Sequence, residues 1–269
     1  MIKFQSVTFK HRNGVVAVKD INLDIFPNEI TTIVGANGAG KTTLVKHING
    51  LLKPTQGQVN VFGIDTRKVS VAQLSKKVGI VFQNPVHQLF SDSVANEIIF
   101  ALKNFGYDEE TIKKRVDWAL GSFNLQEYRD FSPLMLSSGE KKRLCIATVL
   151  AWDPDIIIFD EPTAGQDYIQ KERLGQIIRM LVQQGKSVII VTHDIEFIWP
   201  LSPRVIVMSK GSILADGPAN LIFDDDRVIK EASIARPQLM ELARSLKIKP
   251  KNPFENVHQS RGWILSHIK

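Results

Sequence analysis

The stretch Gly35-Ala36-Asn37-Gly38-Ala39-Gly40-Lys41-Thr42 fits the pattern G-x-x-x-x-G-K-[ST] of a phosphate-binding loop. Residues 30–34 before it have the pattern of a short apolar strand, and residues 41–49 after it have the pattern of a helix. Glycines let backbone N–H groups turn inward around phosphate oxygens, and the helix directs the positive end of its dipole at the same anions. The expected nucleotide-binding residues are Asn37, Gly38, Ala39, Gly40, Lys41, Thr42 and Thr43.

Two side chains of this loop and a later acid pair have specific expected roles. Lys41 supplies a positive charge to the β- and γ-phosphates, and the Thr42 hydroxyl supplies an oxygen ligand to Mg²⁺. The loop alone leaves kinases, GTPases and motor ATPases open. Residues 156–159 form an apolar run that ends in Asp160-Glu161, and ligands bind at the carboxyl ends of strands in α/β sheets. We expect Asp160 to hold Mg²⁺ through water and Glu161 to deprotonate the attacking water.

The composition is that of a globular protein. The chain has 269 residues, of which 43% are hydrophobic, enough to bury a large core. No apolar stretch approaches the roughly 18–20 residues that span a bilayer, and the first residues lack the apolar segment of a secretory signal. The single cysteine, Cys145, lies in an apolar helical pattern and is expected to be buried. Because these apolar segments are missing, we expect a cytoplasmic protein. The net charge of +6 is scattered, so we expect no specific nucleic-acid binding.

Strand and helix patterns alternate along most of the chain, which predicts an α/β fold with a mostly parallel sheet. Residues 96–125 interrupt this alternation with a charged helical pattern. Near the end, Leu239, Leu242, Ala243 and Leu246 share a helical stripe. We expect one ATPase domain over residues 1–230, with a helical subdomain inserted at about 92–150, and a C-terminal extension over 231–269.

Further segments resemble the motifs of the ABC (ATP-binding cassette) ATPases. Residues 136–140, Leu-Ser-Ser-Gly-Glu, are similar to the family's signature, usually written LSGGQ. Members of this family pair head to tail, so that the signature of one chain covers the γ-phosphate bound by the other. The resemblance spans roughly residues 1–222. It implies the P-loop NTPase fold of an ABC cassette, with antiparallel strands at the N-terminus and with ATP and Mg²⁺ as ligands.

The same resemblance assigns roles to individual residues. Gln83 is expected to reach Mg²⁺ and the attacking water, and His193, which follows an apolar run, is expected to contact the γ-phosphate. His11 stands where the family often has an aromatic residue that stacks on adenine. The residues expected to contact the ATP of the partner chain are Ser137, Ser138, Gly139 and Asp167.

Three departures from the family's pattern bear on how the chain pairs. Ser138 replaces the first glycine of the signature pair, Glu140 replaces its glutamine, and Gln166 stands where leucine is usual. Because a signature serves the nucleotide of the partner, these changes favour pairing with a related, non-identical cassette, and a homodimer stays open. They also leave open an ATP-sensing role, with slow turnover at the opposite site.

Two segments narrow the resemblance to the ATPases of energy-coupling factor (ECF) transporters, a group that includes the cobalt-importer ATPases. Residues 83–90 with 96–100 resemble that group's QNP..Q(L/I)F stretch, and residues 235–243 resemble its C-terminal extension, which helps two ATPases pair. The resemblance implies a peripheral protein at the cytoplasmic face of the cell membrane. Its partners would be a second ATPase, an integral membrane T subunit and a substrate-binding membrane S subunit, and its cargo a vitamin or a transition-metal ion.

Two other functions remain as alternatives at this point. The ATPase subunit of a conventional ABC transporter is the nearer one, since it shares every motif except the two ECF-like segments. A soluble ABC ATPase acting on nucleic acid or ribosomes would suit the basic charge. However, the chain has one cassette and lacks the long coiled-coil or zinc insert of repair ATPases.

Overall fold

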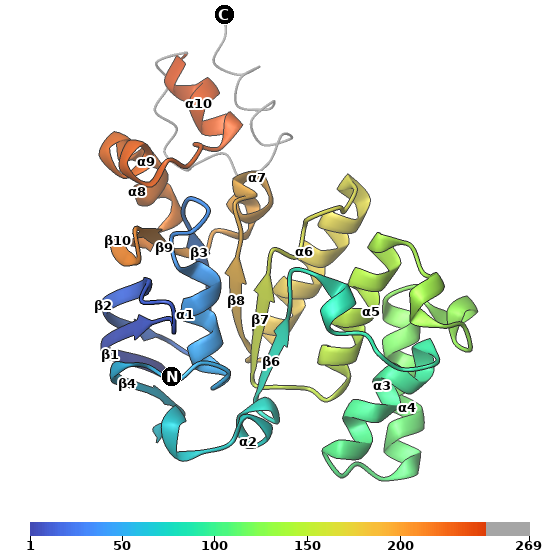
Figure 1. The fold of residues 1–269 in the computed structure, drawn as a ribbon. Helices are drawn as coiled ribbons and strands as arrows, with labels where there is room; N and C mark the ends of the chain where they lie inside the picture. The colour runs from blue at the N-terminus through green and yellow to red at the C-terminus, as the bar shows by residue number, and fades with distance from the viewer. Residues whose placement is uncertain (246–269) are drawn as a thin grey trace, which may run out of the picture.

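The structure is a computed structural model that describes residues 1–245, in which two sheets are surrounded by helices (Figure 1). The strands are β1 (Ile2–Lys10), β2 (Val16–Ile25), β3 (Ile30–Val34), β4 (Gln56–Val61), β5 (Ile64–Asp65), β6 (Val78–Val81), β7 (Ile156–Asp160), β8 (Ser187–Val191), β9 (Arg204–Ser209) and β10 (Ser212–Pro218). The α-helices are α1 (Lys41–Ile48), α2 (Val71–Ser75), α3 (Val94–Asn104), α4 (Glu109–Ser122), α5 (Ser138–Ala151), α6 (Tyr168–Gln183), α7 (Ile195–Ile198), α8 (Ala219–Asp224), α9 (Asp226–Ala232) and α10 (Gln238–Ser245). Short 3₁₀ turns are η1 (Thr66–Lys68), η2 (Pro85–His87), η3 (Gln126–Tyr128), η4 (Pro133–Met135) and η5 (Trp199–Leu201).

The six-stranded sheet confirms the predicted mostly parallel arrangement. Its order is β10-β9-β3-β8-β7-β6, and only the edge pair β9–β10 is antiparallel. Every residue of β7 and β8 is buried, which explains why these strands are continuous apolar runs rather than alternating ones. Because the parallel strands share a direction, the carboxyl ends of β3, β7 and β8 lie side by side at the same end of the strands, which we call the carboxyl edge of the sheet.

The four-stranded sheet is antiparallel, as expected for the N-terminal strands. Its order is β2-β1-β4-β5. In β1, Ile2 and Phe4 are buried while Lys3 and Gln5 are exposed, so one face of this sheet packs inward. Its buried side chains form one core with Leu44 of α1 and with the near face of the six-stranded sheet. Helix α1 therefore lies between the two sheets (Figure 1).

Helices α3, α4, α5 and α6 contribute to a second core on the opposite face of the six-stranded sheet. Helices α3 to α5 fill the chain between β6 and β7, and they lie together at one side of the molecule (Figure 1). Helix α5 runs through the centre of this core, and Cys145 in it is fully buried, as expected. Burial raises the pKa of the Cys145 thiol to about 12. The domain limits 1–230 and 92–150 remain predictions.

The C-terminal part of the described chain forms α8, α9 and α10. Arg236 pairs with Asp226 and Glu241, and Arg244 pairs with Asp224 and Asp226, which ties α10 to the two preceding helices. The predicted helical stripe is only partly covered. Its members are Ala243, which is buried, Leu239, which is half-buried, Leu242, which is exposed, and Leu246, which lies outside the described residues together with the rest of the 246–269 tail. None of the helices described within residues 1–245 has the length and apolar character needed to cross a membrane.

Candidate active site

The phosphate-binding loop joins the end of β3 to the start of α1. At Gly35 the backbone φ is +146°, and a Cβ atom would lie 2.1 Å from the carbonyl oxygen of Met208 in β9. Gly38 also has a positive φ, +79°, but nothing lies within 4 Å of the position that its Cβ would take. Close packing therefore requires glycine at Gly35, whereas Gly38 leaves the backbone open to an approaching ligand.

The Lys41 side chain reaches back into this loop. Its Nζ donates hydrogen bonds to the carbonyl oxygens of Gly35 at 2.7 Å and Ala36 at 3.0 Å. Burial lowers the pKa of Lys41, and the negative charges of Glu161 and Asp160 oppose that effect. The ammonium group therefore lies against the carbonyl groups of the loop, where a phosphate would supply the counter-charge that favours a buried cation.

Asp160, at the end of β7, meets Thr42 in the first turn of α1. The Thr42 Oγ1 lies 3.0 Å from Oδ2 and 3.2 Å from Oδ1 of Asp160. Asp160 is 2% exposed, and burial raises the pKa of its carboxyl group against the opposing hydrogen bond from Thr42. A buried carboxylate beside a hydroxyl oxygen fits Mg²⁺, which is a hard cation that prefers oxygen ligands.

The surroundings of this pair indicate how such a cation would complete its ligands. Within residues 1–245, no three His, Cys, Asp or Glu side chains converge into a metal-binding cluster. Magnesium is commonly held by one or two protein oxygens together with phosphates and waters, rather than by a cage of protein ligands. Thr42 and Asp160 therefore fit a cation that is shared with a nucleotide.

Glu161 is held on several sides at the start of the loop after β7. Its backbone adopts the left-handed conformation, with φ 50°, and its N–H donates to the carbonyl oxygen of Val191 at 2.8 Å. The carboxylate accepts a hydrogen bond from Thr192 Oγ1 at 3.2 Å and lies 2.9 Å from Nδ1 of His193. A non-glycine residue with positive φ is costly and persists only where its surroundings hold it, which is common at active sites.

His193 extends the chain of contacts from Glu161 toward solvent. The side chain of His193 is 71% exposed, whereas that of Glu161 is only 8% exposed. The pair thus joins a buried carboxylate to an exposed imidazole, which is suited to the transfer of a proton or to contact with a bound anion. Thr192, which is fully buried, was not singled out from the sequence, although it directly precedes the predicted histidine.

The buried lysine Lys142 is hydrogen-bonded to the backbone at Gln83. Lys142 of α5 is 2% exposed, and its Nζ donates to the carbonyl oxygens of Gln83 at 2.8 Å and Phe82 at 3.2 Å. Burial lowers the pKa of Lys142, and the nearby negative groups, among them Asp160 and Glu161, oppose that effect. The Gln83 side chain itself is exposed. The sequence analysis did not single out Lys142. Its position on the buried side of the helix could have been inferred from the helical spacing of the neighbouring apolar residues.

The signature-like segment forms the N-terminus of α5. Ser137 is the N-cap, and its hydroxyl accepts from the N–H of Glu140 at 3.3 Å. The Glu140 carboxylate accepts in return from the N–H of Ser137 at 2.8 Å, which completes a capping box. These bonds to Ser137, together with one from Tyr128, lower the pKa of Glu140. Glu140, read from the sequence as a departure from the signature, thus stabilises the start of this helix.

Asp167 and His11 have other contacts in the structure. Asp167 is the N-cap of α6, where its carboxylate accepts from the N–H of Gln170 at 2.8 Å. The His11 ring lies edge-on to Phe9, with the ring centroids 5.0 Å apart. Among the described residues, no hydrogen bond joins the segment Ser137, Ser138 and Gly139 to the phosphate-binding loop. At Gly139, nothing lies within 4 Å of the position that a Cβ would take.

Comparisons with known proteins identify similar chains. The sequence profile of the family described as ABC transporter matches residues 18–164. The energy-coupling factor transporter ATP-binding protein EcfA2 of Clostridium tetani is 40% identical, with 90% of this chain and 85% of that protein covered. The corresponding protein EcfA of Methanocaldococcus jannaschii is 34% identical over 100% of this chain and 98% of its own length. The structure of cbiO1 from Clostridium perfringens, described as part of the ABC transporter complex cbiONQ, matches with TM-score 0.75 at 34% identity, covering 92% of this chain and 98% of that one.

Proposed function

Because this chain belongs to the ABC transporter family of ATP-binding proteins, we propose that it is the ATPase subunit of an energy-coupling factor transporter and powers the uptake of a vitamin or a transition-metal ion. The observation that carries this proposal is the side-by-side placement of Lys41, the Thr42–Asp160 pair and the Glu161–His193 pair at one edge of the parallel sheet. This arrangement holds a triphosphate, a cation and a water-activating base within reach of one another.

The phosphate-binding loop and the first turn of α1 supply most of the proposed contacts to the nucleotide. Backbone amides of residues 37–43 and the Lys41 ammonium group bind the phosphates, and His11 stacks against the adenine. Thr42, Asp160 and the exposed Gln83 would hold Mg²⁺, which would supply positive charge to the phosphates. The buried carboxylate of Asp160 is well placed for this because a nearby cation offsets the cost of its burial.

Hydrolysis requires a base that takes a proton from water. Glu161 serves as this base, with Thr192 and His193 fixing the orientation of its carboxylate. The exposed His193 ring contacts the γ-phosphate, so that nucleotide binding and positioning of the base are connected through one hydrogen bond. Glu161→Gln is therefore expected to lower ATP turnover by about 10²–10⁴-fold and to preserve ATP binding. Glu172→Gln, on the exposed side of α6, is the control and should keep the parental rate.

The contacts with a partner's nucleotide come from two helix starts. The N-terminus of α5, with Ser137, Ser138 and Gly139, faces the γ-phosphate of the partner chain, and the open space at Gly139 supports close approach there. Asp167, exposed at the start of α6, contributes the second contact. The partner is a related, non-identical cassette, because Ser138 and Gln166 depart from the family pattern. The extension over residues 231–269 assists the pairing.

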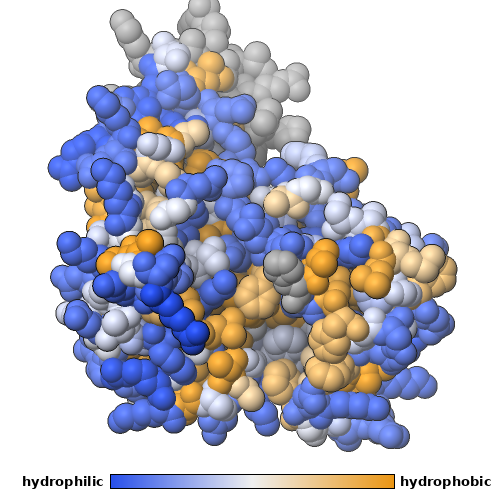
Figure 2. Space-filling model, viewed as in Figure 1, coloured by the Kyte–Doolittle hydropathy of each residue, from blue (hydrophilic) through white to orange (hydrophobic). Residues whose placement is uncertain are grey.

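An exposed apolar surface supports a membrane partner at the cytoplasmic face of the cell membrane. Figure 2 shows apolar side chains gathering on the face where the α3–α5 helices meet the rest of the molecule. Phe90 and Phe100, whose ring centroids lie 4.8 Å apart, are both exposed there. A contiguous apolar surface of this kind marks an interaction site. We assign it to the integral membrane T subunit, which in turn associates with the substrate-binding S subunit.

Copurification tests the assignment to a transporter. The tagged chain is expressed in its own host, the membranes are solubilised gently, and bound proteins are identified by mass spectrometry. A multi-spanning T-type protein, a second cassette ATPase and a small hydrophobic S-type protein are expected, and the S-type protein would identify the cargo. Recovery of ribosomal or DNA-bound proteins without an integral membrane partner would refute the transport function and leave the ATPase activity untouched.

A further inference from the structure

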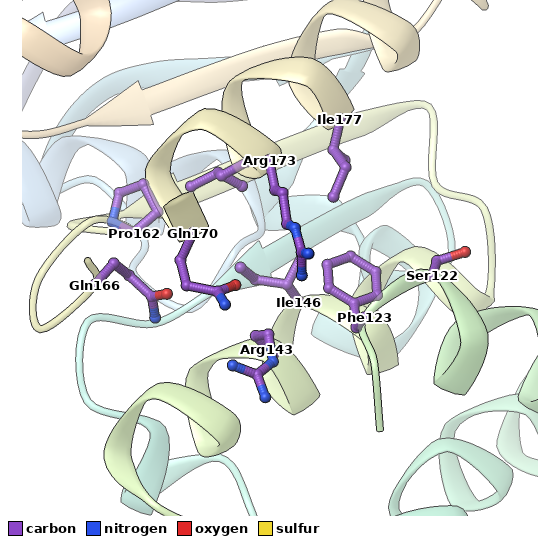
Figure 3. A pocket seen from close by; sticks show the side chains of 10 residues that line it. Ser122, Phe123, Arg143, Ile146, Pro162, Gln166, Gln170, Arg173 and Ile177 are labelled. Carbon is purple, nitrogen blue, oxygen red and sulfur yellow. The ribbon is translucent and has the colours of Figure 1, made fainter. Parts of the chain in front are cut away.

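A small cavity lies between α5 and α6, with Pro162 in its wall (Figure 3). Its volume is about 30 Å³. A water-sized group needs roughly 10–15 Å³ of such space, so the cavity is large enough for a group slightly bigger than one water molecule. Its apolar walls include Phe123, Ile146 and Ile177, and its polar side chains are Ser122, Arg143, Gln166, Gln170 and Arg173.

Two of the donors at this cavity are buried and lack an acceptor. The Nε of Arg143 and the Nε2 of Gln166 are buried without a hydrogen-bond partner. Arg173, at the exposed rim, makes no hydrogen bond or ion pair with any residue that the structure describes. Figure 3 shows the Arg173 guanidinium and the Gln170 amide extending from α6 toward α5. No acidic side chain lines the cavity.

The nearest carboxylate is already engaged elsewhere. Glu140 lies 3.9 Å from the Nη2 of Arg143, and its oxygens accept hydrogen bonds from the capping box with Ser137 and from Tyr128. This pairing leaves the Nε of Arg143 and the Nε2 of Gln166 without a partner. Leaving buried donors without acceptors is unfavourable, so the cavity favours a ligand that brings an acceptor and a negative charge.

We propose that this cavity binds the carboxylate group of a small organic acid. Guanidinium groups bind planar carboxylates through paired N–H donors, and two of them face this space. The cavity has room for the carboxylate group alone, so the short hydrocarbon chain lies toward the exposed rim at Arg173. The apolar walls disfavour phosphate, which carries more charge and holds its hydration more strongly. Because α5 begins at the signature-like segment and α6 begins at Asp167, a bound acid bridges the two helix starts proposed to contact the partner's nucleotide.

Binding is measured on the full chain without nucleotide, using acetate and propionate as probes and chloride and phosphate as comparison anions at constant ionic strength. We expect saturable binding of propionate, seen by ligand-observed NMR and as a rise in Tm. Arg173→Gln should weaken that binding by at least about tenfold, because one charge-assisted hydrogen-bond donor is removed. Arg179→Gln is the matched control, since it removes the same charge from α6 at a residue whose hydrogen bond, within residues 1–245, goes to the Pro200 carbonyl. This variant should bind as the parent does.

Gln166→Leu provides a second variant that does not depend on charge. Leucine fills the apolar cavity and removes the unpaired amide, so Tm without acid should rise while the response to propionate is lost. Saturable, variant-sensitive binding supports the proposal. Equal responses of all variants to every anion, no saturable response at all, or tighter binding of phosphate than of propionate would overturn it. None of these measurements depends on ATP hydrolysis, so the proposed transport function is tested separately.

Discussion

Two buried threonines on neighbouring strands should respond in opposite ways to the same substitution. Thr192, directly after β8, donates to Glu161 Oε2 at 3.2 Å, and its Oγ1 accepts from the Asp194 N–H at 3.0 Å. Thr32 in β3 is also fully buried, but its hydroxyl has no hydrogen-bond partner. Replacing threonine by valine exchanges a hydroxyl for a methyl group of similar size, so the two variants differ in hydrogen bonding rather than in volume.

The expected magnitudes follow from these contacts. Thr192→Val removes two hydrogen bonds and leaves the Asp194 N–H and a carboxylate oxygen of Glu161 without this partner, at a cost of about 2 kcal/mol. For a domain of this size, that lowers Tm by roughly 4–8 °C. Thr32→Val removes a buried polar group that gains nothing from its surroundings, so it should raise the free energy of unfolding by about 1 kcal/mol.

The two variants should also differ in their rate of ATP hydrolysis. With one of its orienting hydrogen bonds lost, Glu161 is held less firmly, and a loss of about 1.4 kcal/mol in the reacting geometry corresponds to about tenfold in kcat. Thr32→Val should leave kcat unchanged. The measurements are urea unfolding, thermal unfolding and steady-state ATP hydrolysis. If both variants lose the same stability, or if Thr192→Val keeps the parental kcat, the assignment of Thr192 as the residue that positions Glu161 is wrong.

Four further predictions concern α5 and its N-cap. Gly139→Ala should leave the unfolding free energy of the isolated chain unchanged or slightly higher, because a Cβ meets nothing within 4 Å there, yet lower ATPase activity of the assembled complex; equal activity in a reconstituted complex would contradict the proposed contact. Ser137→Ala should cost about 1 kcal/mol in urea unfolding, because it removes the N-cap. The hydrogen bonds with Ser137 lower the pKa of Glu140 from 4.5. The ionised Glu140 carboxylate therefore stabilises the fold above pH 4.5, and this stabilisation is lost as the pH falls through the lowered pKa of the folded state. The difference in unfolding free energy between the parent and Glu140→Gln should accordingly shrink below about pH 4.5. Cys145, buried and with its pKa raised to about 12, should react with thiol reagents at neutral pH only after unfolding, as followed by mass spectrometry, and rapid labelling of the native chain would contradict its placement.

The sequence alone was sufficient for the elements whose signals are local or are fixed by topology. The glycine-rich loop, the apolar runs and the acid pair predicted β3, α1 and β7 and their meeting at one sheet edge, because parallel strands place their carboxyl ends together. The contact between Thr42 and Asp160 follows from that rule, although 118 residues separate them.

The features that the sequence did not reveal depend on packing between distant segments. Lys142 bonds to carbonyl groups 59 and 60 residues away, and nothing in its neighbours indicates which backbone it meets. The cavity between α5 and α6 likewise exists only because Gln166 and Arg143 approach from separate segments. The capping box was different, since Ser137 followed three residues later by Glu140 is a recognisable S-x-x-E pattern, which the resemblance to a glutamine-containing signature obscured.

Helix α5 connects the proposed membrane contact to the proposed partner contact, because its first turns are held by different neighbours. Ser137 and Glu140 fix its N-terminus through the reciprocal cap, and one turn later Lys142 is bonded to the carbonyl oxygens of Phe82 and Gln83. A cation that is only 2% exposed cannot leave its acceptors without a large desolvation cost, so α5 and the chain after β6 are expected to move together. The exposed ring of Phe90 lies on that same stretch of chain. A membrane protein that displaces it is therefore expected to shift the N-terminus of α5, and with it the segment proposed to face the partner's γ-phosphate, without contacting either nucleotide.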